Sequence, residues 1–291
     1  MPPSKSSKIK KVFGIFGNPI AHTLSPLMHQ TAFETLGLPY TYVPFKVQNH
    51  ALEQATRSLA ALGISGINVT IPHKKNIIPF LDEITPTASK IGAVNTIDNR
   101  SGRLIGHNTD GAGFIASLRE QGVDPAGMVV FLIGAGGAAR GVAVALLAAG
   151  VKKMVIQVRN INRGRYLADH LSAHFSDVEM TVKQMAFGKN EPIQTKGKIL
   201  LINTTPLGMK PDDPLPFDSS FIHTGWVVAD LIYRPYETAL LLAAKKRGAT
   251  TVPGLGMLLY QGALAFKIWT KEKPPIEAMR QSLLSAFSDS D

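Results

Sequence analysis

Residues 128–140 read MVVFLIGAGGAAR, and this stretch decides the fold of the second half of the chain. Its first six residues form an uncharged apolar run, which predicts a buried strand. A turn of glycine and alanine follows, and the small residues at 138–149 predict a helix. The order of strand, glycine-rich turn and helix is typical of the start of a doubly wound α/β domain.

The turn has the spacing G-x-G-x-x-A, with Gly134, Gly136 and Ala139 in the three fixed places. In dinucleotide-binding domains this spacing lets the backbone approach a pyrophosphate, which the N–H groups at the helix start then bind. A flexible glycine–alanine loop is the alternative, but the strand before it and the helix after it favour a cofactor. The expected cofactor contacts in the turn are Gly134, Ala135, Gly136, Gly137 and Ala138.

The next predicted strand, at 154–158, is followed by RNINR at 159–163. A domain that binds NAD usually has an acidic residue here, which accepts hydrogen bonds from the ribose. In this chain no acidic residue lies between this strand and Asp169, and Arg159 directly follows the strand. A guanidinium forms paired, charge-assisted hydrogen bonds with a phosphate, so the sequence favours NADP over NAD. A solvated basic helix start is the alternative interpretation.

The rest of the chain alternates apolar runs with amphipathic stretches, which is typical of α/β proteins. We expect further strands at 12–16, 40–44, 66–70, 93–98, 103–107, 199–203, 227–231 and 250–252. We expect further helices at 25–36, 50–62, 74–81, 110–121, 163–175 and 257–269, and a hairpin turn at 99–102. The continuous apolar strands of the second half predict a parallel sheet covered on both faces. The predicted fold class is α/β with two domains, one at 1–110 completed by 256–291, and a Rossmann-like NADP-binding domain at 111–255.

Composition and charge narrow the possible functions. A length of 291 residues fits two domains, and the absence of cysteine excludes disulfides, thiolate metal sites and cysteine nucleophiles. The net charge is +10, but much of the excess lies in the tail lysines Lys5, Lys8, Lys10 and Lys11 and in one patch at 151–165. A tail and a local patch fit a phosphate-bearing small molecule better than a nucleic acid.

The sequence gives no sign of export or membrane insertion. The first eleven residues are polar and basic, without the apolar segment of a secretory signal. The long uncharged run at 248–266 contains Pro253 and four glycines, so we do not expect it to span a membrane. We therefore expect a cytoplasmic protein.

Polar residues follow the predicted strand ends in the first half of the chain. The set is Thr23, Ser25, Thr70, Lys74, Asn95 and Asp110. Hydroxyls, an amide, a lysine and a carboxylate together suit a polyhydroxylated, anionic small molecule. Each has a structural alternative, because Ser25 and Asp110 are also good helix caps and Asn95 is a common turn residue.

Seven motifs in this order resemble the shikimate 5-dehydrogenase family, and they cover about residues 12–270. They are GNPIAHTLSP (17–26), NVTIPHK (68–74), GAVNT (92–96), NTDG (108–111), GAGGA (134–138), NTTPLGM (203–209) and GLGMLLYQ (254–261). The resemblance implies an NADP-dependent oxidoreductase that reversibly reduces 3-dehydroshikimate to shikimate, a step of chorismate and aromatic amino acid biosynthesis.

The resemblance also implies a role for each site residue. Lys74 and Asp110 form the acid–base pair, since a lysine ammonium can donate a proton to the alkoxide that develops when a ketone is reduced. The hydroxyls of Thr23 and Ser25 hold the substrate carboxylate. The other expected substrate contacts are Thr70, Asn95, Tyr233 and Gln261, together with Lys74 and Asp110. The other expected cofactor contacts are Arg159, Arg163, Thr205, Met209, Leu231 and Gly254.

The chain departs from the family pattern at two places, and alternatives stay open. Thr23 replaces the usual serine, and Val158 and Asn160 replace an asparagine and a threonine. Because Thr23 adds a methyl group to the pocket, a quinate/shikimate dehydrogenase with broader substrate or cofactor use is the nearest alternative. A non-catalytic NADPH sensor is disfavoured, because it would need no acid–base pair. A homodimer is compatible with the resemblance.

No metal is expected. His170 and His174 have the spacing of one helix face, but only aspartates lie close to them in the sequence. A solvated helix face explains this pair better than a zinc site.

Overall fold

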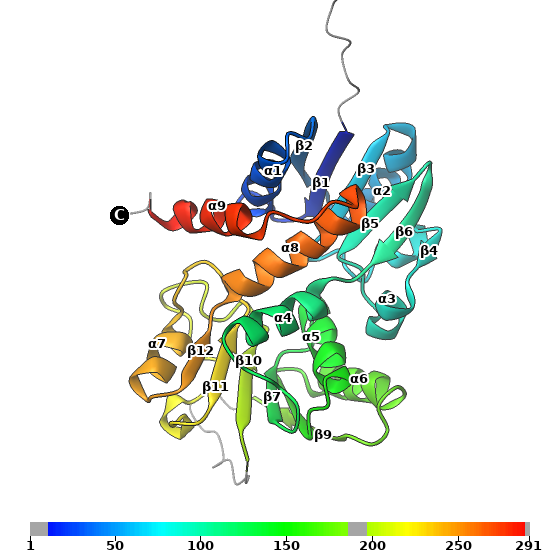
Figure 1. Ribbon diagram of the computed structural model, residues 1–291. Helices are drawn as coiled ribbons and strands as arrows, with labels where there is room; N and C mark the ends of the chain where they lie inside the picture. The colour runs from blue at the N-terminus through cyan, green and yellow to red at the C-terminus, as the bar shows by residue number, and fades with distance from the viewer. Residues whose placement is uncertain (1–10, 186–196, 289–291) are drawn as a thin grey trace, which may run out of the picture. The chain divides into compact units, whose positions relative to one another are not determined.

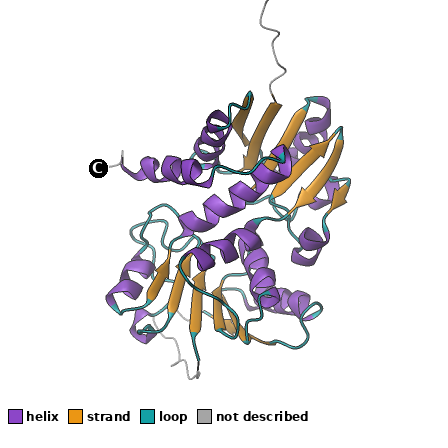
Figure 2. Cartoon of the chain, viewed as in Figure 1, coloured by secondary structure: helices purple, strands orange, loops and turns teal. Residues whose placement is uncertain are grey.

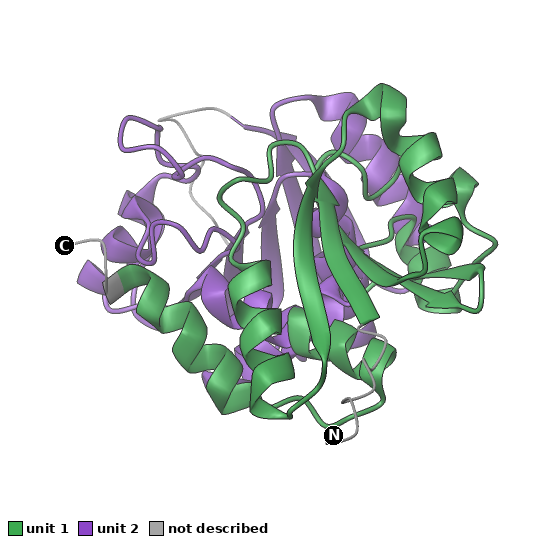
Figure 3. Cartoon of the chain, turned by 90° about the horizontal axis from the view of Figure 1, so that it is seen from above, with its two compact units in different colours: residues 1–108, 262–291 green, residues 109–261 purple. Residues whose placement is uncertain are grey.

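The computed structural model describes residues 11–185 and 197–288 (Figures 1 and 2). The tail lysines Lys5, Lys8 and Lys10 lie outside the described residues. The chain divides into two compact units, residues 1–108 with 262–291 and residues 109–261 (Figure 3). The second break lies after Gln261, inside helix α8 (Gly254–Thr270), whereas the predicted boundary at 255/256 lies near the start of that helix.

The unit formed by residues 109–261 contains a fully parallel six-stranded sheet, as predicted. Its strands lie in the order β12-β11-β10-β7-β8-β9. Their bounds are β7 (Val129–Ile133), β8 (Lys153–Val158), β9 (Glu179–Gln184), β10 (Ile199–Asn203), β11 (Val227–Asp230) and β12 (Thr250–Val252). Counted from β7, this is the 3-2-1-4-5-6 order of dinucleotide-binding domains. The Rossmann-like prediction is therefore confirmed.

One helix of this unit precedes its first strand, and the others follow strands. Their bounds are α4 (Asp110–Glu120), α5 (Gly137–Ala148), α6 (Ile161–Ser172), α7 (Ala239–Lys246) and the short η3 (Ser219–Phe221). Part of the core is a cluster in which Phe131, Leu201 and Val228 of the central strands pack with Trp226 and Leu240. Burying such large apolar side chains contributes about 1.5–3 kcal/mol each, so this cluster holds the strand ends that carry the cofactor turn.

The other unit contains a mixed sheet in the order β2-β1-β3-β5-β6-β4. The strands are β1 (Lys11–Gly17), β2 (Tyr40–Lys46), β3 (Ile64–Val69), β4 (Glu83–Ile84), β5 (Thr96–Arg100) and β6 (Arg103–His107). β1 pairs in parallel with β2 and β3, while β5 is antiparallel to β3 and β6. Arg100 pairs with Arg103 across the turn Ser101-Gly102, which confirms the predicted hairpin.

Five helices and two single turns of 3₁₀ helix complete the described part of this unit. They are α1 (Ser25–Thr35), η1 (Asn49–Ala51), α2 (Leu52–Ala61), η2 (Ile78–Phe80), α3 (Pro86–Ile91), α9 (Ile276–Ser288) and the second part of α8. The helix predicted at 74–81 is wrong, because that segment forms turns and η2. Pro79 has no N–H for an α-helical hydrogen bond, and its ring clashes with the carbonyl one turn earlier.

Strand β2 lies at an edge of the mixed sheet. Tyr42 N–H donates to the side-chain oxygen of Gln30 on α1 at 3.3 Å. Pro44, two residues along the same strand, has no N–H. Within the described ranges, no helix has the length and apolarity that crossing a bilayer requires.

Candidate active site

The ends of β1 and β3 bring several predicted substrate residues into one group of loops. Thr70 N–H donates to Phe16 O at 2.9 Å, directly after β3. Val69 N–H donates to Asn95 O at 2.8 Å, just before β5. The bond between Val69 and Asn95 brings Thr70 and Asn95 close together, although 25 positions separate them in the sequence.

Lys74 lies in the turn that follows Thr70. Its main-chain oxygen accepts a hydrogen bond from Val94 N–H at 2.7 Å, so the lysine backbone is tied to the segment that carries Asn95. Lys74 is half-buried, whereas its neighbour Lys75 is exposed. The structure thus separates the two adjacent lysines, which the sequence alone does not.

Thr23 and Ser25 form a pair of hydroxyls at the start of α1. Thr23 Oγ1 donates to Ser25 Oγ at 3.3 Å and accepts a hydrogen bond from Ser25 N–H at 3.3 Å. Helix α1 is capped at Leu24 without a side-chain bond, so Ser25 is not the capping residue. Ser25 is buried at 3% exposure, a position that a helix cap would not need.

Asp110 and Gln261 belong to the unit of residues 109–261. Asp110 is the first residue of α4 and is 3% exposed, while Thr109 occupies the cap position. A carboxylate in the first turn of a helix is favoured by the helix dipole. A Cβ on Gly113 would lie 2.6 Å from Gln261 N, so α4 and the Gln261 backbone are in close contact.

The glycine turn after β7 has the geometry of a phosphate cradle. Gly134 has φ +112°, and a Cβ there would lie 2.5 Å from Thr204 Oγ1, so only glycine fits. Gly136 caps α5, and the space beside it is open to 4 Å among the described residues. Free N–H groups at this helix start are suited to bind a pyrophosphate. The residues present therefore fit a dinucleotide.

Two arginines follow β8, the strand beside the glycine turn. Gly134 N–H donates to Gln157 O at 2.9 Å, which ties the turn to the end of β8. Arg159 comes directly after that strand and Arg163 lies in the first turn of α6, where Asn160 Oδ1 accepts from its N–H at 3.3 Å. Both arginines are exposed, and neither has an ion-pair partner in the described part of the chain. Such a pair suits a phosphate group.

A buried network next to the glycine turn escaped the sequence analysis. Asn203 Nδ2 donates to Asp230 Oδ1 at 3.0 Å, and Asn203 Oδ1 accepts from Thr205 Oγ1 at 2.7 Å. Asp230 also accepts from Ile232 N–H at 3.0 Å and from Thr238 Oγ1 at 2.8 Å. Burial raises the pKa of Asp230 to about 6, and these hydrogen bonds oppose the rise. The sequence does contain a signal for this network, because Asn203 and Asp230 are polar residues that end continuous apolar strands.

The remaining cofactor candidates lie on loops after β10 and β11 and at the start of α8. A Cβ on Gly254 would lie 2.5 Å from Ile232 O and 2.6 Å from Leu231 C, so the start of α8 packs against the Leu231 backbone. Tyr233 is half-buried two residues further on. Met209 is 56% exposed, which is unusual for a large apolar side chain and fits a surface that a ligand covers.

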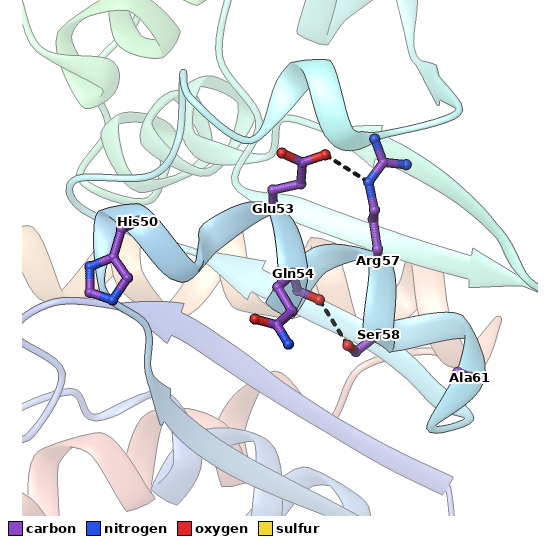
Figure 4. Close-up of a pocket in the computed structure, with 6 residues that line it drawn as sticks. All are labelled: His50, Glu53, Gln54, Arg57, Ser58 and Ala61. Carbon is purple, nitrogen blue, oxygen red and sulfur yellow. Dashed lines mark hydrogen bonds and ion pairs between the residues drawn. The ribbon is translucent and has the colours of Figure 1, made fainter.

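A shallow surface hollow of about 500 Å³ lies on α2 and the turn before it (Figure 4). It is lined by His50, Glu53, Gln54, Arg57, Ser58 and Ala61. Arg57 and Glu53 form an ion pair at 2.9 Å within this surface. None of the predicted site residues lines it, so it is not the candidate active site.

The comparisons with known proteins agree with this geometry. Family models match at residues 15–97 (shikimate dehydrogenase substrate binding domain), 118–188 (shikimate / quinate 5-dehydrogenase) and 254–284 (shikimate 5'-dehydrogenase C-terminal domain). The NADP(+) shikimate dehydrogenase of Carboxydothermus hydrogenoformans is 45% identical over 94% of this chain and 96% of its own length. The chain belongs to the shikimate dehydrogenase family.

Two solved structures are similar to this chain over nearly its full length. Shikimate 5-dehydrogenase from Thermus thermophilus, in complex with NADP(H) and shikimate, has a TM-score of 0.83 and 34% identity over 95% of this chain and 99% of that one. Quinate dehydrogenase from Corynebacterium glutamicum, in complex with NAD, has a TM-score of 0.84 and 28% identity over 95% and 99%. The first of these two proteins holds shikimate and NADP(H), and the second, a quinate dehydrogenase, holds NAD.

Proposed function

We propose that this protein is a shikimate dehydrogenase that reversibly reduces 3-dehydroshikimate to shikimate with NADPH. The observation that carries the proposal is the pair of main-chain hydrogen bonds Val69–Asn95 and Val94–Lys74, which bring Thr70, Asn95 and the Lys74 turn into one loop group. This group combines polar side chains with a half-buried lysine, as a polyhydroxylated ketone requires. The curated relative named above carries the same activity in its name.

We assign substrate binding to residues 1–110 with 256–291, and NADP binding to residues 111–255. The substrate-binding family model, which matches at 15–97, supports the first assignment. The parallel sheet and its glycine turn support the second. Arg159 and Arg163 bind the 2′-phosphate of NADP, while Thr205, Met209, Leu231 and Gly254 border the cofactor.

The proposed chemistry uses one lysine and one carboxylate. NADPH supplies the hydride when bound. The ammonium group of Lys74 stabilises the negative charge that develops on the carbonyl oxygen and donates the proton that neutralises it. The family resemblance assigns Asp110 as the second member of this acid–base pair. Thr23 and Ser25 hold the carboxylate, and Thr70, Asn95, Tyr233 and Gln261 bind the ring substituents.

A quinate/shikimate dehydrogenase is the second candidate function. The observation that favours it is the methyl group of Thr23, which alters the hydroxyl pair expected to bind the carboxylate. The similarity to a protein named quinate dehydrogenase supports this candidate.

One assay separates the two candidates. The purified protein is given shikimate and quinate in turn, each with NADP and with NAD, and reduction of the cofactor is followed by its absorbance. We expect the highest kcat/KM for shikimate with NADP. Comparable values for both acids would support the second candidate, and no turnover of either acid would refute both.

We also propose a cytoplasmic location and a homodimeric assembly. Without cysteine the chain forms no disulfides, which fits a reducing compartment and supports the location. The family resemblance supports the assembly. Fractionation of the source cells tests the first, and light scattering on the eluted protein tests the second. A monomeric mass would refute the dimer.

A further inference from the structure

A chain of buried polar side chains connects two of the proposed substrate residues. It runs through Ser25, Tyr42, Asn68, Thr96 and Asn95, and we name it the Asn68 chain. All five residues are at most 5% exposed. Tyr42 reaches from β2 across the intervening strand β1 to Asn68 on β3, and Thr96 begins β5.

The orientation of the Asn68 amide is fixed by the main chain. Its Nδ2 lies 3.2 Å from Asn95 O, which can only accept, so this atom must be the NH₂ group. The Oδ1 atom therefore accepts, and Tyr42 O–H donates to it at 2.7 Å. Burial raises the pKa of Tyr42 well above its ordinary value, while a hydrogen bond with Ser25 opposes this effect. Tyr42 thus stays protonated at neutral pH.

The same amide sets the direction of the hydrogen bonds toward Asn95. Asn68 Nδ2 donates its second proton to Thr96 Oγ1 at 3.1 Å. Thr96 therefore uses its own proton to donate to Asn95 Oδ1 at 3.0 Å. Because Thr96 donates to Asn95 Oδ1, it fixes which end of the Asn95 amide is the oxygen and which is the NH₂ group.

The ring of Tyr42 is also held in place. His29 stacks on it with ring centroids 4.5 Å apart and planes 7° apart. Burial lowers the pKa of His29 to about 3, so the imidazole is neutral. In the described chain neither ring nitrogen meets hydrogen-bond geometry, although Asn68 lies close enough to oppose the effect of burial. The stack therefore fixes the tyrosine by packing.

We propose that Tyr42, Asn68 and Thr96 are positioning residues for the substrate site. Asn68 determines which atoms Ser25 and Asn95 present, so Asn95 offers N–H donors to an oxygen acceptor on the substrate ring. This inference rests on the proposed function, because it needs Asn95 to bind substrate.

Thr96→Val tests the inference. Valine has the same shape, suits a strand and lacks the hydroxyl, so the Asn95 amide loses the group that fixes its orientation. Loss of one well-placed hydrogen bond predicts a roughly five- to tenfold rise in the KM for shikimate, at about 1.4 kcal/mol per factor of ten. We expect kcat and the KM for NADP to change less than about twofold, because neither depends on this amide. Thr96→Ser keeps the hydroxyl and should restore the KM.

Thr56→Val is the matched control. Thr56 is fully buried on α2, and its hydroxyl donates to Leu52 O at 2.7 Å, away from the Asn68 chain. Both valine variants remove one buried hydroxyl from the same unit, and urea unfolding measures what each does to stability. Only Thr96→Val should raise the KM for shikimate. Equal kinetic constants for the two variants would overturn the inference.

Asn95→Ala separates this inference from the proposed function. If the wild-type protein oxidises shikimate and Asn95→Ala raises its KM, the function and the site stand. A normal KM in Thr96→Val would then refute the positioning role alone. If the wild-type protein does not turn over shikimate, the proposed function fails first.

Discussion

The buried carboxyl of Asp230 makes stability depend on pH in an unusual direction. Its pKa is raised by burial from 3.8 to about 6, at 1% exposure. Between these two pH values the folded protein binds a proton that the unfolded chain has already released. The folded state is therefore favoured by this group below pH 4 and loses that contribution as the pH rises to 6.

The size of the effect follows from the shift in pKa. About two pKa units at 1.36 kcal/mol per unit correspond to a loss of roughly 3 kcal/mol, of which about 2 kcal/mol falls between pH 4.5 and 7.5. Asp230→Asn removes the ionisation and keeps one oxygen for the N–H donors of Asn203 and Ile232. Its amide group then faces Thr238 Oγ1, which adds a constant cost of about 1 kcal/mol at every pH.

Urea unfolding at pH 4.5, 5.5, 6.5 and 7.5 measures the effect in both proteins. Other titrating groups are shared, so they cancel in the difference between the two free energies of unfolding. We expect that difference to move by about 2 kcal/mol in favour of Asp230→Asn across this range. A difference that stays constant within about 0.5 kcal/mol, or that moves the other way, would refute the raised pKa.

Three further predictions concern the reaction. Lys74→Met should lower kcat by about 10²–10⁴-fold while NADPH binding, followed by fluorescence, is unchanged, and the matched Lys75→Met should keep full turnover. Arg159→Ala should weaken NADP binding about tenfold and leave NAD binding unaffected. This is the lower end of the effect of a charged hydrogen bond, because the side chain is exposed. Equal losses for the two cofactors would exclude a phosphate contact. Thr23→Ser should leave the kcat/KM for shikimate nearly unchanged and raise the kcat/KM for quinate. The rise should be no more than the roughly 1–3 kcal/mol by which one methyl group alters discrimination. A fall in the kcat/KM for quinate would contradict crowding by the Thr23 methyl group.

Local signals predicted the elements that carry the cofactor turn. The run at 128–133 and the small residues after it became β7 and α5, because a continuous apolar strand and a glycine turn are local properties. Strand β9 was missed, since its sequence EMTVKQ alternates polar residues at a sheet edge and is only partly buried. The helix predicted at 74–81 is wrong because Pro79 interrupts the apolar pattern.

The polar networks were beyond the reach of sequence reasoning. Tyr42 and Asn68 are 26 residues apart, and Asn203 and Asp230 are 27 apart. Nothing in a single sequence pairs such residues, because strand order and register decide which side chains meet. The site motifs were found because each is contiguous, whereas the groups that orient them come from neighbouring strands.

The edge of the mixed sheet at β2 restricts how this protein can associate with other chains. A strand that tried to extend the sheet there would need N–H donors at alternate positions of β2. It would find the donor of Tyr42 already used by Gln30 and none at Pro44. Growth of the sheet from this side is therefore blocked at two successive positions, and self-association here has to proceed through side chains rather than through the backbone.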